Sequence, residues 1–425
     1  MTRHTLSRLQ RATGFAAALF LTGALAAGAA NGIRVPNGGL PEGATKCAAG
    51  NPNTARFSQS CGALVTLTAG DATPAYVQDN SPSAEGTYRA RFYVNPRLLQ
   101  ISGSGFDVLA AYDGADPVPP ANAGNAVFRV VIQQSGSQKQ LTAFARLNSG
   151  NESQITAPIN IANGWRSVEV DWAKGAGNGH LNLWVDGKAQ TTGLTALTND
   201  TETINYVRWG AVSGLDGNAS GSFRLDDFAS QRSGYVGPAF PFGDVDSTSS
   251  FFSFVQGVFA AEVIQGCSVG SFCPNGAITR KEMSQFLLLA KNGASYVPPP
   301  CTTATFSDVP CSNPYAPWIY EIAREGITSG CSTGLFCPDG TITRSQMSVF
   351  LMVARGFPPA ACPPSSFADV PTSSPFCGWI NQVAAKGITA GCGGGNFCPE
   401  SLVLRGQMSV FLSTAFGIPT HAVGP

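Results

Sequence analysis

Charged side chains are scarce in this sequence. The 425 residues include 26 Lys and Arg and 26 Asp and Glu, which is 12% of the chain and leaves a formal net charge of +0. A chain with this balance lacks the basic surface that binds nucleic acids and acidic membranes. We therefore expect neither of them as a partner.

Histidine is rarer still, with three residues in the chain and none between positions 181 and 420. A Ser-His-Asp site in the N-terminal half would have to use His180, and no G-x-S-x-G motif accompanies it. The scarcity argues against this class of hydrolase, and it also argues against zinc sites, which commonly use imidazole ligands.

Hydrophobic runs of membrane-spanning length are missing after the N-terminus. The N-terminus itself carries Arg3, Arg8 and Arg11, then an apolar segment at 15–25 and small residues up to Ala29. This is the pattern of a signal peptide. We predict a signal peptide over 1–29, a linker over 30–46 and a secreted mature chain without a transmembrane segment. An uncleaved N-terminal anchor is the alternative.

Residues 47–230 read as a series of short segments with alternating apolar and polar residues. In 165–173, Val168, Val170 and Trp172 alternate with polar side chains, which is the period of a strand with one buried face. Clusters of Gly, Asn, Asp and Pro separate the segments. We predict a two-sheet antiparallel β-sandwich. The expected strands are 62–68, 87–94, 106–112, 126–133, 140–147, 165–173, 180–187, 203–213 and 222–229.

The stretch WRSVEVDWAKGAGNGHLNLWVDGKA (165–189) and the closing SFRLDDFA (222–229) resemble the concanavalin A-like, laminin-G-like jelly rolls. The resemblance implies a jelly roll that binds a carbohydrate or a protein. Cys47 and Cys61 lie at the N-terminal edge of this domain. Because an exported chain meets an oxidising compartment, we expect a disulfide between them.

Glucanases of the concanavalin A-like class carry an E-x-D-x-x-E strand whose two glutamates are nucleophile and acid. This chain has Glu169 and Asp171, but Lys174 stands at the place of the second glutamate. A cation cannot serve as that general acid. We therefore predict no enzyme and no catalytic residues, and keep an anchored glycoside hydrolase with an unrecognised site as an alternative.

Cofactors are not indicated either. We predict no cofactor, with a Ca²⁺ ion bound by scattered acidic residues of the sandwich as the alternative. Ordinary surface carboxylates explain these residues equally well. The tryptophans at alternating positions are better explained by core packing than by a sugar platform. The acidic residues are Asp113, Asp216, Asp226 and Asp227, and the tryptophans are Trp165, Trp172, Trp184 and Trp209.

From residue 242 the sequence repeats itself three times. Taking the Phe of F-x-D-V as zero, Asp recurs at +2, Gly at +24, Cys at +25 and +31, Arg at +38 and Met at +41. We place a linker at 231–241 and the repeats at 242–295, 302–358 and 363–418.

The pattern within each copy predicts a helix, a loop and a second helix. Thr279 and Thr343 cap the second helix, whereas Leu404 in the third copy predicts a weaker helix start.

The cysteines of the repeats recur at one local spacing, which implies local pairing. We expect three short disulfide loops and two further bridges between the Pro-rich connectors and the following segment. Zinc thiolate ligation is the alternative. The expected pairs are Cys267 with Cys273, Cys331 with Cys337, Cys392 with Cys398, Cys301 with Cys311, and Cys362 with Cys377.

Each repeat places an arginine, Arg280, Arg344 or Arg405, in the first turn of its second helix. Free backbone N–H groups and the helix dipole favour an anion there, and a guanidinium adds a planar fork for a carboxylate. A groove built in this way should hold a sugar that carries a carboxylate. The alternative is that each arginine pairs with the Asp of F-x-D-V and only holds the repeat together.

The motifs F-x-D-V, G-x₅-F-x-P and I-T-R-x-E/Q resemble S-layer homology repeats. The resemblance implies a pseudo-threefold unit that anchors the protein to cell-wall polysaccharide or peptidoglycan at a bacterial surface. The third groove departs from the pattern and is expected to be weaker or inactive. A structural surface-layer subunit is a further alternative. The implied glycan-binding residues are the three arginines, Gly266, Gly330, Gly391, Trp318, Trp379, Asp244, Asp308 and Asp369.

Overall fold

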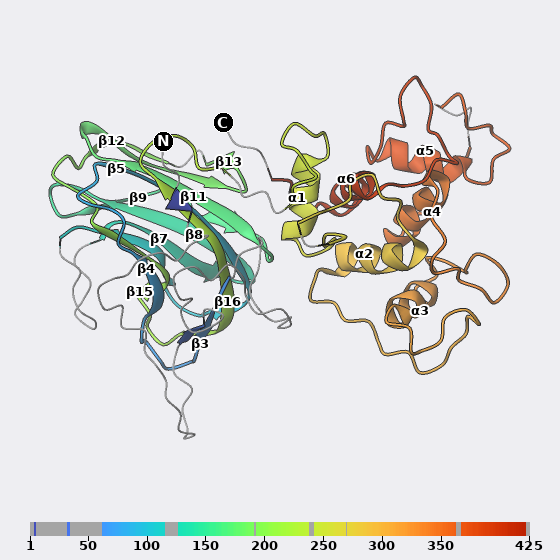
Figure 1. The fold of residues 1–425 in the computed structure, drawn as a ribbon, viewed down its shortest axis with the longest axis horizontal. Coiled ribbons are helices and arrows are strands. Elements are labelled where there is room, and N and C mark those ends of the chain that lie inside the picture. Colours follow the sequence, from blue (N-terminus) through green and yellow to red (C-terminus); the bar gives the residue numbers. More distant parts are fainter. Residues whose placement is uncertain are drawn as a thin grey trace. The chain divides into compact units, whose positions relative to one another are not determined.

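The computed structural model describes residues 62–114, 126–190, 193–237, 242–268, 270–362 and 367–421, together with the backbone of 4–5 and 32–34. The chain divides into two compact units (Figure 1). Met1–Pro241 and Ala422–Pro425 form the first, here called the sandwich unit, and Phe242–His421 form the second, here called the repeat unit.

The sandwich unit contains two antiparallel sheets. The first runs in the order β13-β12-β11-β5-β16-β3-β2, with β1 paired to β16 and β14 to β12. Its strands are β1 (His4–Thr5), β2 (Gly32–Arg34), β3 (Ala63–Leu67), β5 (Thr87–Ile101), β11 (Arg166–Ala173), β12 (Ala176–Val185), β13 (Lys188–Ala189), β14 (Leu194–Thr198) and β16 (Ala219–Gln231).

The second sheet runs in the order β10-β8-β7-β6-β15-β4, with β9 paired to β8. Its strands are β4 (Ala75–Asp79), β6 (Phe106–Tyr112), β7 (Ala126–Ser135), β8 (Gln138–Arg146), β9 (Glu152–Gln154), β10 (Ile159–Ile161) and β15 (Tyr206–Ser213).

One apolar core lies between the two sheets. The alternation read from the sequence is present: Val168, Val170 and Trp172 of β11 are fully buried in this core. Trp209 also packs there, stacked on Phe228. The predicted antiparallel sandwich is therefore confirmed. The short strands β4 and β14 were not expected, because they carry too few alternating residues to stand out from the loops around them.

The repeat unit contains two helices from each copy: α1 (Phe252–Ala260), α2 (Arg280–Asn292), α3 (Ala316–Arg324), α4 (Arg344–Ala354), α5 (Cys377–Ala385) and α6 (Arg405–Phe416). Thr279 and Thr343 accept hydrogen bonds from the backbone of Glu282 and Gln346, as predicted for capping boxes. Leu404 has no side-chain oxygen, so α6 keeps only the return bond from its own N–H to Gln407.

A ring of backbone hydrogen bonds joins the three copies. Ile278 donates to the carbonyl of Val403 over 2.9 Å, Val403 to Ile342 over 3.0 Å, and Ile342 back to Ile278 over 3.2 Å. These residues occupy the same position in each copy. One continuous apolar core also runs through all three copies. The copies therefore fold together around a pseudo-threefold axis and depend on one another for stability.

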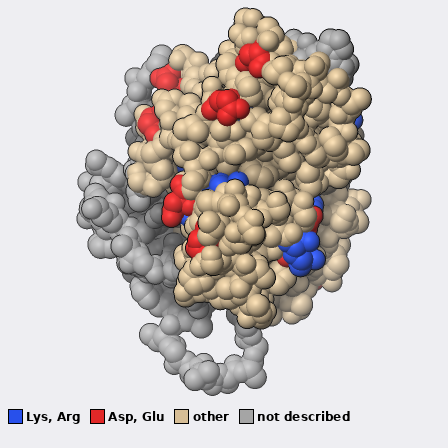
Figure 2. Space-filling view, turned by 90° about the vertical axis from the view of Figure 1, so that its right-hand side faces the viewer, with Lys and Arg blue, Asp and Glu red and all other residues tan. Residues whose placement is uncertain are grey.

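Charged groups are sparse on the surface as well as in the sequence. Figure 2 shows a face on which the basic and acidic side chains are few and scattered among uncharged residues. Within the part of the chain that is described, no helix combines the length and the apolar character needed to span a bilayer.

Candidate functional site

The three short disulfide loops are the starting point of the site. The structure pairs Cys267 with Cys273, Cys331 with Cys337, and Cys392 with Cys398. The second cysteine of each loop adopts a positive φ of 56° or 57°, a conformation that residues other than glycine rarely hold. The expected bridges Cys301–Cys311 and Cys362–Cys377 are also present. The expected pair Cys47–Cys61 lies outside the described residues.

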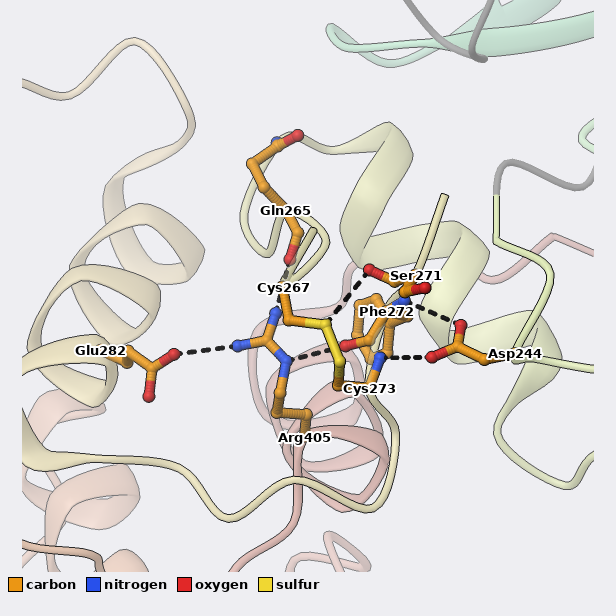
Figure 3. The surroundings of a disulfide bond; sticks show 8 residues. All are labelled: Asp244, Gln265, Cys267, Ser271, Phe272, Cys273, Glu282 and Arg405. Carbon is orange, nitrogen blue, oxygen red and sulfur yellow. Dashed lines mark hydrogen bonds and ion pairs between the residues drawn. A yellow bond between two sulfur atoms is a disulfide. The ribbon is translucent and has the colours of Figure 1, made fainter. Parts of the chain in front are cut away.

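A carboxylate holds each loop from the F-x-D-V motif. Asp308 accepts the N–H of Phe336 over 2.9 Å and that of Cys337 over 2.7 Å. Asp244 and Asp369 make the same two bonds in their own copies, and Figure 3 shows the pair at Asp244. Two charge-assisted bonds to successive amides fix both the position and the orientation of the loop.

The glycine before each loop has a packing role. A Cβ on Gly330 would lie 2.3 Å from the carbonyl oxygen of Leu335 and 3.2 Å from the ring of Phe306. Gly266 and Gly391 face the equivalent carbonyl and ring just as closely. The carbonyl contacts are closer than real Cβ atoms allow, so the glycines let the loop close over the first residue of the motif.

Each arginine extends from its own copy to the disulfide loop of the next. Arg280 donates Nε–H to the carbonyl of Phe336 over 2.7 Å, Arg344 to that of Phe397 over 2.8 Å, and Arg405 to that of Phe272 over 2.9 Å. Each guanidinium also lies 4.7–5.2 Å from the centre of the same phenylalanine ring. The arginines thus form a cyclic set of contacts, here called the three seams.

The second terminal nitrogen of each guanidinium is also engaged. Nη2 of Arg280 reaches Thr328 Oγ1 at 3.3 Å, and Nη2 of Arg344 reaches Thr389 Oγ1 at 3.5 Å. In the third seam, Nη2 of Arg405 donates to the backbone carbonyl of Gln265 over 2.6 Å. The arginines are only 4–5% exposed, so most of each guanidinium serves to join neighbouring copies.

The expectation of free N–H groups at these helix starts is wrong. Arg280 N donates to the carbonyl of Gly340 over 2.8 Å and Lys281 N to that of Pro338 over 2.9 Å. The helices α4 and α6 make the equivalent bonds to the following copy. Carbonyls of residues that directly follow the disulfide loops therefore already occupy the donors that a helix start would offer to an anion.

The alternative pairs each arginine with an aspartate of F-x-D-V, and the structure places that aspartate in the following copy. Asp308 lies in the seam of Arg280, an arginine of the preceding copy, and both of its oxygens accept backbone N–H groups. Burial lowers the pKa of Arg280, and the nearby Asp308 carboxylate partly opposes that effect. Arg280 and Asp308 therefore interact across the boundary between two copies. Phe336 connects them, because its carbonyl accepts from Arg280 and its N–H donates to Asp308.

The third seam differs from the other two in a second contact. In the third, Glu282 Oε1 accepts a hydrogen bond from Nη1 of Arg405 over 3.1 Å (Figure 3). The equivalent residues of the other two seams are Gln346 and Gln407, whose side-chain oxygens accept from cap N–H groups. Among the described residues, Nη1 of Arg280 and Nη1 of Arg344 have no hydrogen-bond partner. In two seams the guanidinium therefore keeps one N–H edge without a hydrogen-bond partner.

The expected aromatics Trp318 and Trp379 are half-buried against the shared core. Tyr296 lies edge-on to Trp318 with 6.3 Å between ring centres. Thr328 and Thr389 were not singled out from the sequence, and the loop phenylalanines were noted only as the Phe of the G-x₅-F-x-P motif, without a contact role. Thr recurs at +22 in two copies and Phe at +30 in all three, so the repeat alignment contained a signal for both.

In the sandwich unit, Glu169 and Asp171 lie on one face of β11, as the alternation predicts, but they have different partners. Asp171 receives two hydrogen bonds of 2.8 Å from Arg89, and His180 Nε2 lies 3.0 Å from Oδ2 of Asp171. Glu169 accepts backbone N–H groups from Val236 and Gly237. Burial raises the pKa of Glu169 to about 7, against the lowering effect of these bonds.

Lys174 is exposed at the end of the strand, and no second carboxylate replaces the missing glutamate among these contacts. The aspartates considered for Ca²⁺ are each engaged separately. Asp113 pairs with Arg146, Asp227 with Arg91, and Asp216 and Asp226 each accept a nearby backbone N–H. No group of three or more metal-ligating side chains occurs among the residues described.

A profile of the S-layer homology domain matches residues 241–284, 305–348 and 366–409. An endoglucanase of Bacillus sp. (strain KSM-635) is 33% identical over 120 residues, which is 27% of this chain and 12% of the endoglucanase. A cell surface protein of Thermoanaerobacter kivui is 32% identical over 119 residues, which is 27% of this chain and 16% of that protein. The match thus spans less than a fifth of either relative.

Among solved structures, the binding domain of Paraclostridial Mosquitocidal Protein 1 covers 41% of both chains at 12% identity, with a TM-score of 0.29. The globular domain of T. cruzi calreticulin covers 42% of this chain and 76% of its own at 14% identity, with a TM-score of 0.28. These likenesses are too distant to carry an argument.

S-layer homology domains are the modules that hold proteins at the cell surface by binding cell-wall polymers. The repeat unit of this chain consists of three S-layer homology domains, and the chain is a cell-surface-anchored protein.

Proposed function

We propose that two seams of the repeat unit bind acidic cell-wall glycan and thereby attach the protein to the wall without a covalent bond. The observation that carries this proposal is the free Nη1 edge of Arg280 and of Arg344 beside disulfide loops that hold the rest of each guanidinium in place. A sugar that carries a carboxylate, such as a ketal-linked pyruvate, supplies the acceptor that this edge lacks.

The fixed position of each guanidinium supports this function. An arginine on a flexible stem loses rotamer entropy when it binds a ligand. Here Nε is held by a loop carbonyl and Nη2 by a threonine hydroxyl before any ligand arrives. The remaining N–H groups are therefore already oriented, and the low exposure of the side chain strengthens their charge interaction.

The third seam fits a structural role better. Glu282 supplies Arg405 with a carboxylate from within the protein, so an incoming acidic sugar would have to compete with it. The sequence predicted a weaker third groove on other grounds, namely the missing cap at Leu404, and the contact of Glu282 supports the same assignment. We assign the acidic-sugar sites to the seams of Arg280 and Arg344 only.

We further propose that the sandwich unit is a non-catalytic binding domain displayed from this anchor. Asp171 is bound by Arg89 and His180, and Lys174 takes the place of the general acid of a retaining glucanase. The similarity to the endoglucanase lies in the S-layer homology region and therefore concerns the anchor rather than this unit.

The anchor is tested by cosedimentation of the full-length protein with purified sacculi that carry pyruvylated polysaccharide, before and after mild acid removal of pyruvate. Arg280→Lys with Arg344→Lys keeps both charges but removes the forked edge. We expect at least tenfold weaker binding, because a lost charge-assisted contact costs about 1.5–3 kcal/mol.

Arg405→Lys is the matched control. It removes the equivalent hydrogen bond to a loop carbonyl, but in the seam where Glu282 already pairs with the arginine. We expect its binding to change less than twofold. An equal loss of binding in the double variant and in Arg405→Lys would contradict the proposal, and so would unchanged binding by the folded double variant. In either case all three arginines would have only a structural role.

A further inference from the structure

The segment 232–237, which follows β16 and precedes the repeat unit, is packed on the outer face of the first sheet of the sandwich. Val236 N donates to Glu169 Oε1 over 2.8 Å and Gly237 N donates to Glu169 Oε2 over 3.0 Å. The ring of Tyr235 lies 5.7 Å from that of Trp184. We call residues 232–237 the strap.

The face beneath the strap is a row of three residues on three neighbouring strands. Glu169 of β11 lies directly opposite Trp184 of β12 on one side and Arg91 of β5 on the other. Directly opposite residues on antiparallel strands have their Cβ atoms about 5 Å apart. The row therefore places an aromatic ring, a carboxylate and a guanidinium next to one another on a rigid sheet.

Two donors of this row are buried without an acceptor. Within the described part of the chain, neither Nε of Arg91 nor Nε1 of Trp184 has a hydrogen-bond partner, and Arg91 is 4% exposed. Arg91 uses Nη2 for a long contact of 3.3 Å with Asp227. Buried donors are normally satisfied, so unpaired ones beside a buried carboxylate indicate that the strap is an incomplete partner for this face.

The contacts of the strap are those that a sugar makes. A pyranose presents a C–H face that packs on an aromatic ring, and Tyr235 already packs its tilted ring against Trp184. Two vicinal hydroxyls donate to the two oxygens of one carboxylate, as the amides of Val236 and Gly237 do to Glu169. A sugar also carries ring and hydroxyl oxygens that accept from Arg91 and Trp184, which the strap does not provide.

We infer that the row Trp184, Glu169 and Arg91 is a binding site for a neutral pyranose unit of a glycan, and that the strap occupies it as an internal mimic of that ligand. The inference deepens the proposed role of the sandwich unit as a displayed binding domain and rests on it. A glycan has to displace the strap, so the free protein binds weakly.

The experiment opens the strap in the full-length protein. Tyr235→Ala removes the ring that packs against Trp184, and Gly237→Pro removes one donated N–H at a residue whose φ of +77° proline cannot adopt. Calorimetric titrations use three probes: cellohexaose, laminarihexaose and N-acetylated chitohexaose. We expect the opened double variant to bind at least one probe at least tenfold more tightly than the unaltered protein does.

Trp184→Ala, added to the opened variant, tests whether the gain belongs to this row. We expect it to abolish the tighter binding while near-ultraviolet circular dichroism shows an intact sandwich. An opened, folded variant that binds every probe no better than the parent overturns the inference, as does a gain that survives Trp184→Ala. The three soluble probes carry no carboxylate and therefore do not report on the seams, so failure here is distinct from failure of the anchor.

Discussion

Arg405 and Phe272 lie 133 residues apart in the sequence, yet Nε of the arginine donates to the phenylalanine carbonyl over 2.9 Å. This contact joins the third S-layer homology domain to the first and closes the cycle that Arg280 and Arg344 begin. The closed cycle explains why three copies are needed: each copy supplies an arginine to one neighbour and a loop to the other.

The aspartate of F-x-D-V is predicted to be a stability residue. Asp308→Ala leaves the N–H groups of Phe336 and Cys337 without partners, and each such loss costs about 1–3 kcal/mol. We expect the free energy of unfolding of the repeat unit to fall by about 3 kcal/mol in urea denaturation. Asp339→Asn, at a residue whose side chain is 78% exposed, should change it by less than about 0.5 kcal/mol. Similar losses in the two variants would contradict this role.

The glycine at +24 is predicted to be required by the close approach of the loop. Gly330→Ala places a Cβ 2.3 Å from the carbonyl oxygen of Leu335, whereas Gly334→Ala meets nothing within 4 Å. Both glycines have positive φ, so both variants carry the backbone strain of about 1–2 kcal/mol. We expect the thermal midpoint to fall clearly further in Gly330→Ala, because overpacking adds about 1–3 kcal/mol. Equal midpoints would show that the loop can move aside.

The sequence allowed much of this architecture to be predicted, because the repeat was aligned without gaps and each repeated residue has a repeated contact. Capping by Thr279 and Thr343, and the five disulfide pairs of the repeat unit, follow from local spacing. The alternation in β11 likewise placed Glu169 and Asp171 on one face.

The partners across the seams could not be predicted in the same way. Local spacing does not say that Arg280 reaches the loop of the following copy rather than its own aspartate, because that choice depends on how the copies pack. The use of helix-start N–H groups by Gly340 and Pro338 is hidden for the same reason. The strap was missed because Tyr235, Val236 and Gly237 carry no periodic pattern.

Glu169 is predicted to make the sandwich unit less stable as the pH rises from about 4.5 to about 7. Burial raises its pKa from the ordinary 4.5 to about 7, so the folded state binds a proton that the unfolded state has released. The stabilisation is complete below pH 4.5 and is lost as the pH passes through 7. Its size is about 3 kcal/mol, because the two pKa values differ by about 2.5 and each pKa unit corresponds to about 1.36 kcal/mol.

Urea denaturation followed by tryptophan fluorescence at several pH values between 4.5 and 7.5 measures this effect. Glu169→Gln cannot ionise, so its stability should vary less with pH than that of the parent, and the difference between the two should grow across this window. Parallel pH profiles for the two proteins would show that Glu169 is not the group responsible.

Glu282 is predicted to decide how many acidic sugars one repeat unit binds. Glu282→Gln keeps an oxygen that can accept the N–H of Thr279 but removes the negative charge beside Nη1 of Arg405. The third seam then has a glutamine at this position, as the other two seams do. We expect the calorimetric stoichiometry for a soluble pyruvylated wall oligosaccharide to rise from two sites per chain to three, and binding to sacculi to strengthen.

Gln346→Glu is the reciprocal change, because it places a carboxylate beside Arg280 and should reduce the stoichiometry to one. If neither substitution alters the number of sites, the charge at this position does not control the seams, and the assignment of the ligand to the free edges of Arg280 and Arg344 is wrong.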